Sequence, residues 1–309
     1  MTGAQIAWLV THSSGFHADE VMASVILTEI FPDAELVRTR APDWITPAPD
    51  RVIYDVGGAY DAAAGIFDHH QRGAPLREDG QPLSSFGLIW QHFGRNFLAL
   101  SGIPAEEIDS VHAAFDRDFV LPVDLIDNGS INPSAAGPLS SLTLPALLET
   151  LKPAFDETAP AAETRAFAVA LGIARSFIQA GIAGHAAKIR ADILVQQAIA
   201  RAGQDAVLEL PSGMPFRKAV EKAGADHLLF VVHPRKSDWC VTGIRQREGD
   251  FALRADLPQA WAGLTDAALE AVTGVEGATF CHNARFIAAA KTREAALRLA
   301  QIAVAAVRG

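Results

Sequence analysis

Cysteine, basic residues and long apolar runs are all scarce in this 309-residue chain. The two cysteines, Cys240 and Cys281, are too few for a disulfide framework, so we expect a protein of the reducing cytoplasm. No uninterrupted apolar run reaches the ~18 residues that a membrane span needs. The segment from Met1 to Val10 lacks the basic flank of a signal peptide. We therefore expect no membrane partner.

The low content of basic residues restricts the partners further. Lysine and arginine number 26 against 36 acidic residues, which gives a formal net charge of −10. This balance argues against a broad basic surface that grips long duplex nucleic acid. It leaves a short phosphorylated substrate open, because bound divalent cations would supply positive charge locally.

Short apolar runs alternate with helical patterns in the first half of the chain. The runs predict strands at residues 6–10, 35–37, 51–56 and 65–67. Apolar residues with helical spacing predict helices at residues 21–31, 86–100 and 105–119. Near-continuous apolar strands separated by helices are typical of a parallel sheet with helices on both faces, so the expected class is α/β.

The second half of the chain has a different pattern. A stretch rich in Pro, Ser and Thr at residues 133–160 leaves room for one short helix at 144–151. Residues 161–202 are helical and rich in alanine, with a weak point at Gly181 to Gly184, so we expect two helices there. Short strands follow at 207–210, 228–233, 239–245, 251–255, 278–281 and 285–288, before a last helix at 293–307. We expect a first domain at residues 1–182 and a smaller C-terminal α/β domain at 183–309.

Histidines and aspartates lie where the predicted strands end. His12 follows the first strand, Asp55 ends the third, and Asp68, His69 and His70 follow the fourth; His17 and Asp19 begin the first helix, and Asp124 or Asp127 could add a late carboxylate. The carboxyl ends of parallel strands share one edge of a sheet, where ligands bind. Four of the ten histidines fall on this one edge. We therefore expect these side chains to converge.

The convergent set predicts a metal site. Imidazoles with several carboxylates suit Mn²⁺, Zn²⁺, Fe²⁺ or Co²⁺, and Mg²⁺ where oxygen donors dominate. One metal needs only three or four protein ligands, so seven or eight candidates favour two cations ~3.5–4 Å apart. Asp55, central and isolated in sequence, is the candidate bridging carboxylate, with a bridging hydroxide as nucleophile and phosphate oxygens held by the same metals.

The order of these motifs resembles the MYG-type family (named after the melanocyte proliferating gene) of the DHH phosphoesterase superfamily. The matching segments begin with Thr11-His12 and Phe16-His17-Ala18-Asp19-Glu20, then Tyr54-Asp55-Val56-Gly57-Gly58 and Phe67-Asp68-His69-His70-Gln71-Arg72. They continue with Val123-Asp124, Asp127-Asn128-Gly129, Trp261-Ala262-Gly263-Leu264 and Phe280-Cys281-His282. The similarity spans nearly the whole chain. One departure is Ser14, where the family carries glycine.

The resemblance implies a DHH-phosphoesterase-like fold with the active site in a cleft between two domains. It implies that His12, His17 and Asp55 hold one cation, and that Asp19, Asp55, His69 and the late aspartate hold the other. His70 would face the substrate phosphate, and Asp68 would orient its neighbours. The cations would usually be Mn²⁺, with Mg²⁺, Co²⁺ or Zn²⁺ as alternatives. The implied activity is that of a 3′–5′ exonuclease on short single-stranded RNA or oligonucleotides.

Basic residues gather in the second domain. Between Pro215 and Arg254, the sequence has eight basic residues and five acidic ones. The guanidinium group of arginine can donate two parallel hydrogen bonds to phosphate oxygens, and lysine adds positive charge. Arg235, Lys236 and Arg254 are therefore candidate substrate contacts. His282, at the end of a predicted strand, is a fourth. An ordinary solvated face would give the same pattern.

Two other functions remain open from the sequence. The same scaffold could serve a nucleotide phosphatase or an inorganic pyrophosphatase, although Arg235-Lys236-Ser237 is a poor match for the Arg-Lys-Lys run of such pyrophosphatases. A metal-binding protein without turnover is the alternative from another class, and the surplus of ligands counts against it. The sequence leaves the oligomeric state open, a homodimer included.

Overall fold

The computed structural model describes residues 5–247 and 251–309, which form two compact units, Met1–Ala186 and Ala187–Gly309. Each unit contains one five-stranded sheet with helices packed on it. Both units are therefore α/β, as predicted. The expected strand at 251–255 is wrong, because these residues contribute only an isolated bridge between Leu253 and Arg245.

The sheet of the first unit has the strand order β2-β1-β3-β5-β4. Its strands are β1 (Trp8–Thr11), β2 (Glu35–Arg38), β3 (Arg51–Tyr54), β4 (Tyr60–Asp61) and β5 (Ile66–Phe67). The first four in spatial order run parallel, and β4 adds an antiparallel edge. β1, β3 and β5 therefore end on the same edge of the sheet, which is the arrangement that the candidate ligands require.

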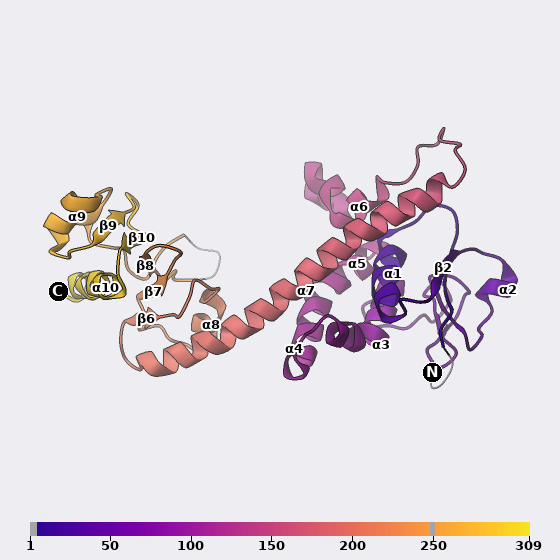
Figure 1. Ribbon diagram of the computed structural model, residues 1–309, viewed down its shortest axis with the longest axis horizontal. Helices are drawn as coiled ribbons and strands as arrows, with labels where there is room; N and C mark the ends of the chain where they lie inside the picture. The colour runs from indigo at the N-terminus through magenta and orange to yellow at the C-terminus, as the bar shows by residue number, and fades with distance from the viewer. Residues whose placement is uncertain (1–4, 248–250) are drawn as a thin grey trace. The chain divides into compact units, whose positions relative to one another are not determined.

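Helices lie on both faces of this sheet, but they cover one face more than the other. Helices α1 (Ala18–Ile30) and α3 (Ser85–Leu100) lie side by side and bury their apolar residues together (Figure 1). Because side chains alternate along a strand, Val10 and Ile53 point to the face of the sheet away from α1 and α3. There they join a small cluster with Trp44 and Ile45 of the four-residue helix α2 (Pro42–Ile45). Leu9 and Val52, on the faces that α1 and α3 cover, are fully buried.

The helix predicted at 105–119 continues much further than expected. Helix α4 (Ala105–Phe115) runs into a π-helical turn (Asp116–Val120) and then α5 (Leu121–Asp127). Pro122 lies in the first turn of α5, where its missing N–H is tolerated. Asp124 and Asp127 therefore lie on a helix, beyond residue 119 where the predicted helix ends. A 3₁₀ segment (Pro133–Leu142) and helix α6 (Leu144–Glu149) follow.

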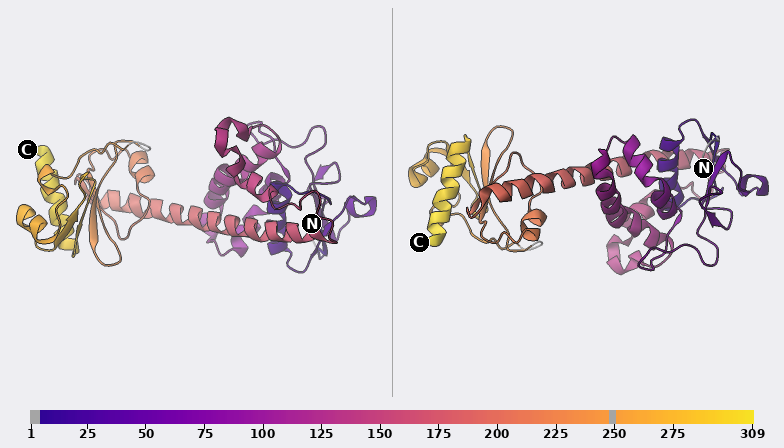
Figure 2. Two further views of the ribbon diagram at one scale, coloured as in Figure 1. Left: turned by 90° about the horizontal axis from the view of Figure 1, so that it is seen from above. Right: turned by 90° about the horizontal axis from the view of Figure 1, so that it is seen from below.

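The expectation of two helices at 161–202 is wrong. Helix α7 (Ala162–Ala202) is continuous over 41 residues (Figures 1 and 2). Gly181 is tolerated because it faces the ring of Phe115, where a Cβ would lie 2.9 Å from Cε2. By length and composition α7 could cross a membrane, a test that core helices of soluble proteins also pass. Phe167, Ala170, Ala174 and Ile178 are buried in the first unit.

The second unit has the strand order β6-β7-β8-β10-β9. Its strands are β6 (Val207–Glu209), β7 (Phe230–Pro234), β8 (Trp239–Gly243), β9 (Ala278–Cys281) and β10 (Ile287–Ala290). Only β6 and β7 pair in parallel. Helix α10 (Arg293–Arg308) packs on the sheet (Figure 2), with α9 (Asp266–Thr273) in the same core. Helix α8 (Arg217–Lys222) contributes to a second cluster with the end of α7.

Candidate metal centre

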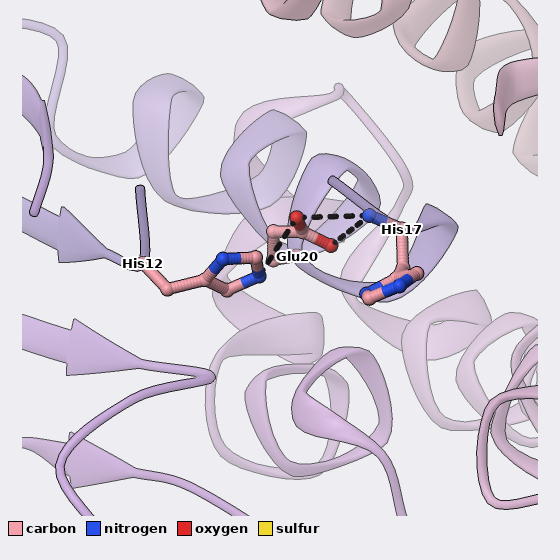
Figure 3. A group of neighbouring side chains, drawn as sticks. All are labelled: His12, His17 and Glu20. Atoms are coloured by element: carbon pink, nitrogen blue, oxygen red, sulfur yellow. Dashed lines mark hydrogen bonds and ion pairs between the residues drawn. The ribbon is translucent and has the colours of Figure 1, made fainter. Parts of the chain in front are cut away.

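The loop between β1 and α1 brings two histidines and two carboxylates together. His12 follows β1 and is buried, and His17 is the N-cap residue of α1. Both carboxylate oxygens of Glu20 accept from the backbone N–H of His17, at 2.8 and 2.9 Å (Figure 3). The same carboxylate lies 3.1 Å from His12 Nε2. Glu20, fully buried, thus connects both histidines of the loop.

Asp55 is the centre of the cluster. It lies just beyond β3 with a positive φ of 56°, a conformation that aspartate tolerates better than most residues. Its Oδ2 is 3.2 Å from His12 Nε2, and its Oδ1 is 3.2 Å from His69 Nε2. Each carboxylate oxygen of Asp55 therefore faces a different histidine. This placement is what a carboxylate shared by two cations requires.

Asp19 and Asp127 complete the cluster around His69. The His69 Nε2 atom is 3.8 Å from Asp19 Oδ2 and 3.5 Å from Asp127 Oδ2. Both carboxylate oxygens of Asp19 are buried and have no hydrogen-bond partner. Burial of a carboxylate without a hydrogen bond is costly, and either a proton or a bound cation would offset that cost. Donor atoms close enough to share an ion form four overlapping sets: His12, His17 and Glu20; Asp55, His69 and His70; Asp19, His69 and Asp127; and Asp19, Glu20 and Asp55.

The electrostatics of the cluster indicate missing positive charge. Burial, together with the charges of Asp55 and Asp127, raises the pKa of Asp19 well above its ordinary value. Burial acts to lower the pKa of His12, but the hydrogen bonds to Asp55 and Glu20 outweigh it and raise that pKa to about 10. Burial acts to raise the pKa of Asp55, and the contacts with His12 and His69 bring it down to about 2. Divalent cations would remove the repulsion that keeps protons in this cluster.

Asp68 is buried beside the exposed His70. Asp68 Oδ2 accepts from the backbone N–H of Gly58 at 2.6 Å, and Oδ1 accepts from that of His69 at 2.8 Å. Oδ1 also lies 2.7 Å from His70 Nδ1. Asp68 therefore holds the segment that carries both histidines. The His70 side chain is 62% exposed, which leaves its ring accessible to a substrate.

The two late aspartates have different surroundings. Asp124 accepts hydrogen bonds from the Ser84 side chain at 2.6 Å, from Gly87 N–H at 3.1 Å and from Arg77 at 2.6 Å. Burial raises the pKa of Asp124 to about 6, against these hydrogen bonds. The Asp124 carboxylate is thus engaged by hydrogen bonds outside the cluster, whereas the Asp127 carboxylate faces His69. We take Asp127 as the late ligand candidate.

The four candidates for substrate contact all lie in the second unit. The guanidinium of Arg235 forms a fork on Asp238, at 2.7 and 2.6 Å, and Lys236 is exposed. Arg254 donates to the carbonyl oxygens of Ala225 and Leu228, so its described contacts are structural. His282 Nδ1 accepts from the N–H of Ala284 at 3.0 Å. A substrate role for these residues, and a site completed by the second domain, stay predictions.

Sequence reasoning missed Glu20 and Asn128. An acidic residue in a first helical turn usually compensates the helix dipole, so nothing marked Glu20 as a cluster member. Asn128 Nδ2 donates to the Asp124 carbonyl at 2.9 Å, and its Oδ1 lies 3.4 Å from His69 Nδ1. It thereby orients the ring whose other nitrogen faces the carboxylates. The sequence Asp127-Asn128-Gly129 is equally consistent with a simple turn.

Comparison with known proteins places this chain in a family. The MYG1 exonuclease family model, described as an uncharacterised protein family (UPF0160), matches residues 8–304. The human protein called MYG1 exonuclease is 32% identical, over 96% of this chain and 85% of its own length. A MYG1 protein of Saccharomyces cerevisiae is 31% identical, over 96% and 95%. The Mn²⁺ complex of RecJ from Thermus thermophilus is 14% identical and covers 96% of this chain and 52% of RecJ, but its TM-score of 0.26 is too low to support an argument. The matches to the family model and to these relatives show that the chain belongs to the MYG1 exonuclease family.

Proposed function

We propose that this protein is a metal-dependent phosphoesterase that hydrolyses phosphodiester bonds, acting as a 3′–5′ exonuclease on short single-stranded RNA or oligonucleotides. The observation that carries the proposal is the buried carboxylate of Asp19, which has no hydrogen-bond partner and lies among Asp55, His69 and Asp127. Relatives named exonucleases support the choice of a phosphodiester substrate.

The residues present fit two divalent cations. His12, His17 and Asp55 would hold one, with Glu20 in the donor set of the two histidines. Asp19, Asp55, His69 and Asp127 would hold the other, most simply as Mn²⁺. When bound, the cations would activate water and neutralise phosphate charge in the transition state. Among the side chains, Asp68 and Asn128 would orient the histidines of the cluster, and the exposed ring of His70 would donate to a phosphate oxygen.

The test is hydrolysis by protein stripped of metal and reloaded with Mn²⁺. We expect release of 5′-mononucleotides from short single-stranded RNA. The variants His69→Ala and Asp55→Asn should lose at least a hundredfold in rate while keeping wild-type circular dichroism spectra. His92→Gln, at an exposed histidine outside the cluster, is the matched control and should keep wild-type activity.

Two results would contradict the proposal. Hydrolysis of pyrophosphate or nucleotides alone would favour a small-phosphate hydrolase. The absence of hydrolysis of any phosphate ester, with any divalent metal, would favour a metal-binding protein without turnover. A cytoplasmic location stays a prediction.

A further inference from the structure

A cavity of about 380 Å³ opens beside the candidate metal ligands in the first unit. One side is formed by Asp55, His69 and Asp127, together with the exposed His17 and His70. The rest of the lining comes from α5, its C-cap residue and α6, with Ala18 of α1: Val123, Ile126, Asn128, Pro145 and Glu149. The volume is near the lower end of the ~300–1,000 Å³ that small-molecule sites occupy. The cavity therefore suits one nucleotide better than a run of nucleotides.

The part of the lining that α5 and α6 contribute, called the helical wall, has little that could read a base. It presents the apolar side chains of Val123, Ile126 and Pro145, and no described lining residue is a Phe, Tyr or Trp on which a base could stack. Asn128 also lines the cavity, but both ends of its amide group are engaged by His69 and by the Asp124 carbonyl. Contacts with this wall would therefore not discriminate between the bases of a nucleotide.

Glu149 is the remaining polar group of this wall. It ends α6, whose first turn is capped by Thr143 and whose Leu148 is buried in the core, and its own side chain is 45% exposed. Its Oε2 accepts from Lys152 Nζ at 2.9 Å. Lys152 in turn lies near Gly15 and the ring of Phe16, in the loop that joins His12 to His17. The pair is thus adjacent to the metal loop.

The charge of Glu149 limits what it can contact. A carboxylate repels a phosphate, so in a nucleotide it must face hydrogen-bond donors. The metal side of the cavity is the side suited to phosphate. The donors that adjoin a 5′-phosphate are the ribose hydroxyls, and the two oxygens of one carboxylate can accept from a neighbouring pair of hydroxyls. The 2′-hydroxyl is the group by which proteins distinguish RNA from DNA.

We propose that Glu149 accepts hydrogen bonds from the free 2′- and 3′-hydroxyls of the terminal ribose whose 5′-phosphate faces Asp55 and His69. This inference rests on the proposed function and adds a specificity residue to it. Glu149 makes the site select a ribonucleotide over a deoxyribonucleotide, and an unblocked 3′ end over an extended or phosphorylated one.

The first test is binding, which does not depend on turnover. The affinities of 5′-AMP and 2′-deoxy-5′-AMP for the Mn²⁺-loaded protein are measured by calorimetry. We expect the ribonucleotide to bind about tenfold more tightly or better, since a hydrogen bond to a charged group contributes ~1.5–3 kcal/mol. In Glu149→Ala the ratio should fall to about one with the metal content unchanged. Glu35→Gln, at an exposed glutamate on β2, is the control and should keep the wild-type ratio.

The second test uses two oligonucleotides of one sequence, with a ribose or a 2′-deoxyribose at the 3′ end. The wild type should favour the ribose end in kcat/KM, and Glu149→Ala should lose that preference. Equal rates on both ends in the wild type, or an unchanged preference in Glu149→Ala, would overturn the inference and leave the proposed function standing. If neither oligonucleotide is cleaved, the proposed function fails, and the nucleotide affinities still decide the role of Glu149.

Discussion

At the scale of single residues, the metal centre is distinguished by how its carboxylates are engaged. Asp55 divides its two oxygens between His12 and His69, Asp19 has buried oxygens without a partner, and Glu20 connects His12 to the backbone of His17. Such an arrangement is costly unless positive charge is added. These residues, and the loop that carries them, lead to three predictions.

Glu20 should affect metal binding through its charge. Glu20→Gln keeps an acceptor for His17 N–H but removes the negative charge next to His12. We expect Mn²⁺ affinity to fall ~10–100-fold, the range seen when partners of ligating residues are changed. Glu20→Ala should in addition destabilise the fold by ~1–2 kcal/mol, because the cap of α1 is lost. If calorimetry shows wild-type Mn²⁺ affinity in Glu20→Gln, Glu20 acts only in capping α1.

Ser14 should be replaceable by glycine without loss. Its φ of 76° lies in the left-handed region, where a residue with a Cβ is strained by ~1–2 kcal/mol. Glycine removes that strain but costs ~0.5–1 kcal/mol of chain entropy. We expect Ser14→Gly to be neutral or to raise the free energy of unfolding by up to ~1 kcal/mol in urea denaturation. Ser13→Gly, outside that region, should lower it, and a loss in Ser14→Gly as large as in Ser13→Gly would contradict this account.

The raised pKa of His12, about 10 in the metal-free cluster, makes metal uptake depend on pH. A cation that binds His12 must displace its proton, and a proton is held more weakly as pH rises. Apparent Mn²⁺ affinity should therefore increase from pH 6 to pH 8, with protons released to the buffer. Calorimetry in two buffers of different ionisation enthalpy measures that release. Binding without proton release would show that His12 is already neutral or is not a ligand.

Sequence could predict which side chains converge but not all of their partners, and the role of these side chains as metal ligands stays a prediction. His12, Asp55 and His69 were predictable because parallel strands end on one edge, a rule that needs no side-chain contacts. The choice of Asp127 over Asp124 depends on the rotation of α5, which the sequence alone does not give. Glu20 and Asn128 were missed because the same residues are common at helix starts and turns.

At the scale of elements, α7 shows where sequence rules gave the wrong answer. Gly181 and Gly184 suggested a break, since glycine weakens a helix by ~1 kcal/mol relative to alanine. The structure shows different surroundings for the two glycines: Gly181 packs against Phe115 of α4, while Gly184 has open space where a Cβ would be. Packing of the first half of α7 on its unit offsets the low propensity.

These two glycines form a matched pair for a stability test. Gly184→Ala should raise the free energy of unfolding by ~0.5–1 kcal/mol, because alanine is the better helix former. Gly181→Ala should lower it by ~1–3 kcal/mol, because its Cβ would overlap the Phe115 ring. Guanidinium denaturation followed by circular dichroism measures both. Shifts of the same sign would show that Phe115 moves aside without cost.

At the scale of the whole molecule, the account predicts a protein whose stability and activity depend on bound metal. The first unit contains every candidate ligand, and a ligand that binds only the folded state stabilises it by mass action. The α/β class of both units and most of the longer strands and helices followed from apolar patterning, whereas the short elements α2, β4, α8 and α9 did not. The number of strands that pair antiparallel did not, because periodicity does not report strand direction.

Two cations that share Asp55 would both be visible in a crystal soaked in Mn²⁺. The anomalous difference map should show two peaks ~3.5–4 Å apart on either side of the Asp55 carboxylate. One peak should lie beside His12 and His17, and the other beside Asp19, His69 and Asp127. A single peak, or peaks away from Asp55, would contradict the claim.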